Sequence, residues 1–279
     1  MAHSIRAIDV NSLAQLQEII SRDPIRHCLV ASRVDAGARG IFKPTFPDIL
    51  GYFDDGHLLS AVLVGANVVP INTSQIARKE IAEMLRKSGR RSSSIVGPAQ
   101  EVLDLWSMLE TSWDKAREIR QNQPVLSTKQ RSHVQFDDSV RYSSLADLDT
   151  LMPACIAMFT EEVGVSPLVG GSSASYRNRI SDLILQRRSF IRTVGDEVMF
   201  KAEVGTVGAG VAQIQGVWVN PKYRGNGIAI PAMAAVLKYV LDDIAPVASL
   251  YVNDFNEAAL ATYFGTGFEQ VDTFATILF

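Results

Sequence analysis

The sequence is poor in the features that build disulfide-bonded, metal-binding or membrane-spanning proteins. Only two of its 279 residues are cysteines, Cys28 and Cys155, and they lie far apart. Such a pair gives neither a disulfide framework nor the spacing of a metal site. No apolar run reaches the roughly 18 residues of a membrane span, and the N-terminus lacks the apolar core of a secretion signal. We therefore expect a cytoplasmic protein with no metal and no membrane partner.

The sequence also has no excess of positive charge, since 27 Lys/Arg against 30 Asp/Glu give a formal net charge of -3. This excludes a globally basic nucleic-acid binder. The segment 78–91 holds six basic and two acidic residues, a pattern more typical of a solvated helix face than of a nucleic-acid site. We expect no nucleic-acid partner, and steeply salt-dependent binding to DNA or RNA would contradict that. Residues 136–279 hold 16 Asp/Glu against 10 Lys/Arg, which favours a cationic partner such as an amine, unless the asymmetry is incidental.

The chain is 47% hydrophobic and 20% charged, as is usual for globular proteins. A polar, proline-containing stretch at 121–135 suggests a linker between two units. We place the units at 1–125 and 136–279, with the linker at 126–135. In the second unit the patterns predict two helices, three strands, a helix at 228–242, a strand at 249–254, a helix at 256–266 and a closing strand. This order indicates an α/β protein (an α+β mixed sheet) with helices on both faces.

Local signals in the first unit predict a similar order. Asp55-Gly56 is a hairpin turn within a strand region at 52–71. A helix at 74–87 ends at Gly89, and a strand at 92–98 and a helix at 99–110 follow. In the second unit, Ser144 and Asp147 form a capping box, and Pro153 is expected to kink or split the helix that begins there.

The segment 217–229, "VWVNPKYRGNGIA", lies between an apolar strand and an apolar helix. Pro221 ends the strand because it has no N–H. Glycines let the backbone approach a ligand closely, and the first N–H groups of a helix are free to bind an anion. Together with Arg224 they predict a phosphate-binding cradle. A plain connection whose glycines serve only the turn is the alternative. The pattern fits neither the Walker nor the dinucleotide motif.

Two motifs in this half resemble those of the GCN5-related N-acetyltransferase (GNAT) family. "RGNGIA" at 224–229 fits the family's Arg/Gln-x-x-Gly-x-Gly/Ala signature. "NEAALATYFGTGF" at 256–268 fits its C-terminal signature, with Asn256 and Tyr263 at the usual spacing. The resemblance covers about 136–279. It implies the acyl-CoA N-acyltransferase fold and an acetyl-CoA or other acyl-CoA cofactor.

The resemblance also implies roles for individual residues. Asn256 would cap its helix and contact the cofactor, a strand N–H near Val219 would stabilise the oxyanion, and Tyr263 would protonate the departing thiolate. A splay between the strand that ends at Val219 and the strand at 249–254 would admit the pantetheine arm. The residues beside that arm would be Val217, Trp218 and Val219. Those around the pyrophosphate would be Arg224, Gly225, Asn226, Gly227, Ile228 and Ala229.

The sequence departs from the family at the general base. Many members carry a glutamate on the strand before the arginine motif, where this chain has the neutral Gln213 and Gln215. No histidine follows His133, and Cys155 reads as a core residue rather than a nucleophile. The remaining candidates for the base are a water chain and the carboxylates of Glu161, Glu162 and Glu203.

The first unit looks similar to a second, degenerate GNAT-like domain, since no Arg-x-x-Gly-x-Ala loop follows its strands. The function that the resemblance implies is transfer of an acetyl group from acetyl-CoA to a primary amine, on a small molecule or a protein. A catalytically weak, acyl-CoA-binding regulatory module is the alternative. The identity of the amine and a homo-oligomeric state are left open.

Overall fold

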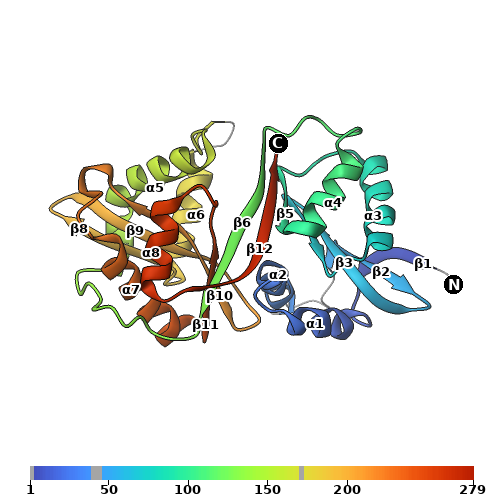
Figure 1. The fold of residues 1–279 in the computed structure, drawn as a ribbon, viewed down its shortest axis with the longest axis horizontal. Helices are drawn as coiled ribbons and strands as arrows, with labels where there is room; N and C mark the ends of the chain where they lie inside the picture. Colours follow the sequence, from blue (N-terminus) through green and yellow to red (C-terminus); the bar gives the residue numbers. More distant parts are fainter. Residues whose placement is uncertain (1–2, 39–45, 170–172) are drawn as a thin grey trace.

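A single twelve-stranded sheet runs through the whole protein in the computed structural model, which describes residues 3–38, 46–169 and 173–279 (Figure 1). The strand order is β1-β2-β3-β4-β5-β12-β6-β11-β10-β9-β8-β7. The strands are β1 (His3–Ile8), β2 (Phe46–Asp54), β3 (His57–Val64), β4 (Asn67–Ile71), β5 (Ser94–Pro98), β6 (Glu118–Thr128), β7 (Arg141–Tyr142), β8 (Ser189–Val194), β9 (Glu197–Gly208), β10 (Val211–Val219), β11 (Val247–Tyr251) and β12 (Glu269–Leu278). The predicted mixed sheet is confirmed.

Eight α-helices cover this sheet within the described residues. They are α1 (Leu13–Arg22), α2 (Cys28–Ala38), α3 (Gln75–Ser88), α4 (Ala99–Leu109), α5 (Leu148–Val163), α6 (Ser173–Leu185), α7 (Ala229–Tyr239) and α8 (Glu257–Thr266). Short 3-10 turns lie at Leu145–Asp147 and Pro221–Tyr223, and a π-helical turn, Val240–Ile244, follows α7. None of the described helices is long and apolar enough to cross a membrane.

Local signals in the sequence account for most element boundaries. Asp55 and Gly56 adopt positive φ angles of 45° and 84° and close the β2–β3 hairpin, as predicted. The Ser74 hydroxyl accepts a hydrogen bond from the Ala77 N–H and caps α3, and Gly89 ends that helix. The predicted Ser144–Asp147 capping box is present.

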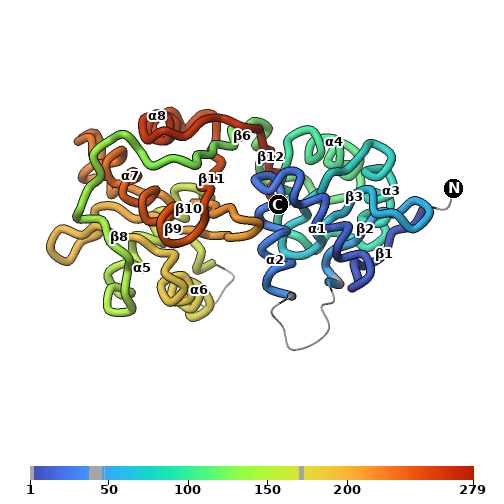
Figure 2. Tube along the Cα trace, turned by 90° about the horizontal axis from the view of Figure 1, so that it is seen from below, coloured from blue at the N-terminus to red at the C-terminus, as the bar shows by residue number. Residues whose placement is uncertain are grey.

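The order of elements repeats in the two halves of the chain. In each half three antiparallel strands lead to a helix, a strand parallel to the third, and a second helix: β2, β3, β4, α3, β5 and α4, then β8, β9, β10, α7, β11 and α8. Helices α1 and α2 pack on one face of the first half, with α3 and α4 on the other. In the second half α5 and α6 pack opposite α7 and α8 (Figure 2).

The two halves exchange their last strands at the centre of the sheet. Strand β6 follows α4 in the first half but pairs with β11 of the second. Strand β12 follows α8 in the second half but pairs with β5 of the first. The two exchanged strands also pair with each other and run side by side between the lobes (Figure 1).

The exchange corrects the predicted linker. The segment 121–135 begins inside β6, and Leu126, at the start of the linker placed at 126–135, is fully buried and paired with Leu250 of β11. The polar run Arg120–Gln123 and Pro124 made this strand look like a linker in the sequence. The run is polar because one side of the first half of β6 faces solvent. Pro153 does not split the helix in which it lies, because α5 is one helix from Leu148 to Val163. The sequence "GVSPLVGGSS" at 164–173 also indicates a loop, of which residues 170–172 lie outside the described residues.

Candidate functional site

The turn between β10 and α7 holds the sequence that predicted a phosphate cradle. Strand β10 ends at Val219, and Asn220 then fixes the turn: its side-chain oxygen accepts from the Lys222 N–H, and its amide donates to the carbonyl of Val198. A 3-10 turn carries the chain to Arg224, and α7 begins at Ala229. The loop therefore leads from the middle of the sheet into the N-terminus of a helix.

Backbone donors are free along this loop. No N–H from Gly225 to Ile230 has an acceptor within the described chain, and Ile228 gives α7 no side-chain cap. Gly225 and Gly227 adopt φ angles of 77° and 70°, and a Cβ atom added at either would meet no atom within 4 Å. The turn therefore needs glycine for its conformation, and it is open on the outside. A row of free N–H groups at a helix N-terminus fits an anionic pyrophosphate.

Strands β10 and β11 diverge beside this loop. Their parallel pairing covers only Val211 to Gln213 of β10, although β10 continues to Val219. The predicted splay is therefore present. A bulge on β10 lies between Gln215 and Trp218, where Gly216 has a φ of 58°. Beyond Gln213, the edge of β10 that faces β11 is not paired with it, as an arm bound like an added strand requires.

Arg224 and Trp218, two predicted cofactor contacts, share one carboxylate. Glu161, near the end of α5, accepts from the indole N–H of Trp218 at 3.1 Å and from the Arg224 guanidinium at 2.7 Å. The Nε of Arg224 also donates to the carbonyl of Val219 at 2.9 Å. The sequence pointed to Glu161 as a candidate base, and the structure pairs it instead with the phosphate loop.

The second motif places Asn256 and Tyr263 on α8. Asn256 caps that helix by accepting from the Ala259 N–H, as expected. Tyr263 is 8% exposed, and its side chain points from α8 into the core, where its ring lies edge-on to that of Phe268. Burial, reinforced by the nearby charge of Glu162, raises the pKa of the Tyr263 phenol far above its usual value. A phenol in this position stays protonated at neutral pH.

The other candidate bases are also engaged. Glu162 pairs with Arg120 of β6 and accepts from the Asn253 side chain. Glu203 is 2% exposed and pairs with the fully buried Lys201. Burial opposes the charge on Glu203, but the adjacent ammonium outweighs it and holds the pKa of this carboxyl below its usual value.

The Lys201–Glu203 pair lies directly beneath the bulge of β10. A Cβ atom on Gly216 would come within 3.2 Å of the lysine Nζ and 3.4 Å of the glutamate Cδ. Cys155 adjoins the pair, and burial raises the pKa of its thiol to about 11, which keeps it a neutral core residue as predicted. Sequence reasoning missed Lys201, because Lys201 and Glu203 alternate with Phe200 and Ala202, a pattern that is typical of a solvent-facing side of a strand.

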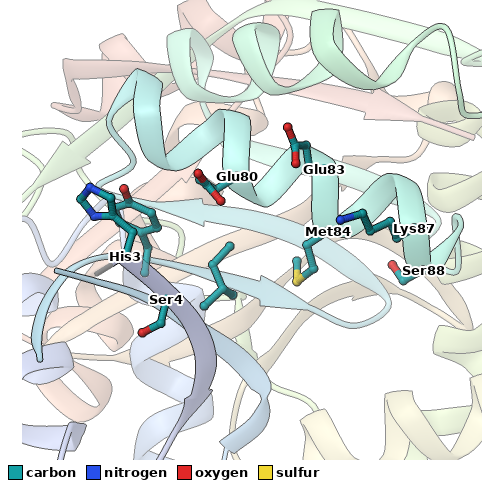
Figure 3. Close-up of a pocket in the computed structure, with 9 residues that line it drawn as sticks. His3, Ser4, Glu80, Glu83, Met84, Lys87 and Ser88 are labelled. Atoms are coloured by element: carbon teal, nitrogen blue, oxygen red, sulfur yellow. The ribbon is translucent and has the colours of Figure 1, made fainter. Parts of the chain in front are cut away.

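The corresponding turn in the first half, between β4 and α3, is filled by the chain itself. Glu101 of α4 accepts from both the N–H and the hydroxyl of Thr73, and Ser74 caps the helix. A pocket of about 500 Å³ also lies in this half, between β1 and α3, where His3 stacks on Tyr52 near Glu80 and Glu83 (Figure 3). Most of the sheet separates it from β10.

Two protein-family models match separate parts of the chain. Residues 156–268 match the family described as "Acetyltransferase (GNAT) family". The chain therefore contains a GNAT domain at residues 156–268. Residues 47–151 match the family described as DUF4081, a domain of unknown function. A comparison with curated protein sequences gave no match.

Solved structures support the GNAT fold over the full chain. An acetyltransferase of the GNAT family from Colwellia psychrerythraea is 12% identical, with a TM-score of 0.58 and 99% of each chain covered. A GCN5-related N-acetyltransferase from Sphaerobacter thermophilus is 12% identical, with a TM-score of 0.59 and coverage of 99% of this chain and 95% of that one. A tandem GNAT protein from the clavulanic acid biosynthesis pathway is 13% identical, with a TM-score of 0.51 and coverage of 99% and 98%.

The GNAT family uses acetyl-CoA, and the loop of the GNAT domain suits it. Free N–H groups, open glycines and a splayed strand pair occur together on β10 and α7. The described residues contain no cluster of three or more His, Cys, Asp or Glu side chains arranged to hold a metal ion.

Proposed function

We propose that the protein is an N-acetyltransferase that moves the acetyl group of acetyl-CoA to a primary amine by direct attack. The observation that carries this proposal is the row of unpartnered N–H groups from Gly225 to Ile230, beside the point where β10 and β11 part. When bound, acetyl-CoA supplies a thioester carbonyl that an amine can attack. Both cysteines are buried and form no disulfide, which supports a location in the reducing cytoplasm.

The loop residues bind and orient the cofactor in this proposal. The N–H groups of Gly225, Gly227 and Ala229 hold the pyrophosphate, with the dipole of α7 behind them. The unpaired edge of β10 at Val217 and Val219 aligns the pantetheine arm, and a strand N–H there stabilises the oxyanion. Trp218 does not line the arm directly in this arrangement, since its side chain packs with α5 and α6 on one face of β10.

Tyr263 supplies the proton for the thiolate in this proposal. Its buried phenol, with a raised pKa, remains a donor throughout the physiological range. Glu162 and Glu203 are each paired with a cation other than Arg224. Glu161 is paired with Arg224. Water, or Glu161 once Arg224 leaves it, is therefore the proton acceptor for the amine.

We also infer that the first half is a degenerate GNAT-like domain that does not bind CoA. Its order of elements repeats that of the GNAT domain, which supports a tandem arrangement. The turn that corresponds to the phosphate loop already holds the carboxylate of Glu101, and that charge repels a phosphate.

Acetyl-CoA binding tests the proposal, with calorimetry on three chains: the wild type, Gly227→Asp and Gly227→Asn. Aspartate and asparagine have nearly the same shape and tolerate positive φ similarly, so they differ mainly in the charge that they place in the cradle. We expect binding by the wild type, moderate weakening in Gly227→Asn, and much greater weakening in Gly227→Asp.

Turnover then separates the two functions. Release of free thiol with a panel of primary amines supports the enzyme. Binding without turnover for any amine supports the acyl-CoA-binding regulatory module. Absence of binding by the wild type contradicts both.

A further inference from the structure

Arg224, the arginine of the phosphate loop, is held by a carboxylate of the same chain. Its guanidinium donates to Glu161 at 2.7 Å, and Glu161 also accepts from the Trp218 indole at 3.1 Å. Among the described residues, Glu161 is the only carboxylate paired with Arg224. The cation that adjoins the free N–H groups is therefore already neutralised.

The pair is built to exchange partners. The side chains of Arg224 and Glu161 are 48% and 45% exposed, so water can solvate each of them when they separate. Exposed ion pairs contribute little to stability, and separating this one costs correspondingly little. Glu161 keeps its hydrogen bond to Trp218 after Arg224 leaves, because the two donors use different oxygens. A doubly charged pyrophosphate on the loop attracts the guanidinium more strongly than one carboxylate does.

We propose that Glu161 is an internal anion that occupies Arg224 until the pyrophosphate of CoA displaces it. The proposal rests on the proposed function, because it assumes that the loop binds CoA. Displacement turns Arg224 toward the phosphates and leaves a free carboxylate on the β10 side of α5. CoA binding and the Arg224–Glu161 contact then oppose each other, and removing one strengthens the other by the same factor.

Calorimetry with CoA on Glu161→Gln tests this opposition. The glutamine keeps the shape of the side chain and its bond to Trp218 but loses the charge. The matched control is Glu197→Gln, since Glu197 forms an exposed ion pair with Lys222 of the same loop at 2.7 Å and does not contact Arg224. Both variants remove one negative charge near the loop, so a general electrostatic effect raises the affinity of both equally.

We expect Glu161→Gln to bind CoA roughly 2- to 5-fold more tightly than Glu197→Gln does, the factor that an exposed ion pair is worth. Equal affinities of the two variants, or weaker binding by Glu161→Gln, would overturn the proposal. Near-equal CoA affinities of the wild type and Glu197→Gln would show that the tighter binding of Glu161→Gln comes from the release of Arg224 and not from the loss of one negative charge.

The Trp218 indole N–H gives a second readout that does not depend on CoA. The chain has three tryptophans, so its indole region in a nitrogen–proton correlation spectrum is simple, and Trp218→Phe assigns the signal. Titration with inorganic pyrophosphate should move the Trp218 resonance in the wild type and in Glu197→Gln, and much less in Glu161→Gln. Sodium chloride at equal ionic strength controls for screening.

The two measurements separate failure of this inference from failure of the proposed function. A wild type that does not bind CoA contradicts the proposed function. In that case the Trp218 signal still tests whether pyrophosphate separates Arg224 from Glu161. A Trp218 resonance that pyrophosphate leaves in place overturns the internal-anion proposal, even where CoA binds and turns over.

Discussion

Glu101 accepts two hydrogen bonds from Thr73, from its backbone N–H at 2.7 Å and from its hydroxyl at 2.5 Å. This contact joins α4 to the turn that leads into α3, and the buried Arg78 donates to the Thr73 carbonyl in the same turn. Among the residues that the structure describes, the corresponding turn of the GNAT domain has no such acceptor for its N–H groups from Gly225 to Ile230. The N-terminus of α3 is thus bound by a carboxylate of the chain itself, whereas that of the corresponding helix, α7, is open to a ligand.

Substituting Glu101→Gln is expected to destabilise the protein without changing acetyl-CoA binding. Replacing the charged acceptor by a neutral one weakens two hydrogen bonds and costs about 1 kcal/mol. In a chain of this size that lowers the melting temperature by roughly 2–4 °C. Glu83→Gln, on the exposed side of α3, is the control and should leave the melting temperature unchanged. A changed CoA affinity in Glu101→Gln would contradict the inference that only the GNAT domain binds the cofactor.

Substituting Tyr263→Phe is expected to lower turnover by about 10²-fold while leaving the affinity for acetyl-CoA nearly unchanged. The substitution removes the proton donor but keeps the ring that packs against Phe268. Tyr239→Phe, which removes a hydroxyl bonded to the Val140 carbonyl away from the loop, controls for the loss of a phenol. Because the Tyr263 pKa is raised, deprotonation of this residue should cause no loss of rate up to about pH 10. Equal rates in wild type and Tyr263→Phe would remove Tyr263 from the mechanism.

Substituting Lys201→Met is expected to destabilise the protein by about 3–5 kcal/mol, because it leaves the Glu203 charge buried and unpaired. The double variant Lys201→Met, Glu203→Gln should recover most of that loss. Urea unfolding of both variants measures the difference. A single variant as stable as the double one would contradict the expectation that loss of Lys201 leaves a costly buried charge.

Stability should fall as the pH drops below 6.5, because His27 is buried at the start of α2. Burial lowers the pKa of His27 to about 4, while Asp23, Arg26 and Asp272 act on it in both directions. The folded state therefore favours the neutral ring, and its contribution is fully present above the unfolded value of about 6.5 and lost as the pH falls toward 4. Between pH 7 and pH 5 the loss is about 2 kcal/mol. His27→Gln, which does not titrate, should show a smaller loss in urea unfolding over the same range.

Sequence patterns predicted the elements whose signals are local. The Asp55-Gly56 turn, the capping box of Ser144 and Asp147 and the loop from Arg224 to Ala229 each depend on a few neighbouring residues, and each lies where expected. The family match to residues 156–268 confirms what the two motifs indicated.

The features that sequence reasoning missed depend on distant partners. Nothing near Phe274 indicates that its strand pairs with Pro98 on one side and Gln123 on the other, since pairing is decided by packing across the sheet. The burial of Lys201 and Glu203 follows from α5 and α6 covering that face, and a strand pattern alone cannot show which face is covered. The contact between Glu101 and Thr73 depends on α4 packing beside α3, and neither local sequence indicates that packing.

The position of β12 affects how the protein folds during its synthesis. This strand lies between β5 and β6, and it follows every other described strand in the chain. A nascent chain that has reached residue 268 therefore carries two open strand edges in its centre, one on β5 and one on β6. Domains generally fold as units from the N-terminus while translation continues. Here β12 completes the sheet of the first half and the core beneath α3 and α4, so these form fully only after the second half has been synthesised. Exposed edges of this kind attract other strands, so the interval before β12 emerges from the ribosome is when the chain most needs protection from aggregation.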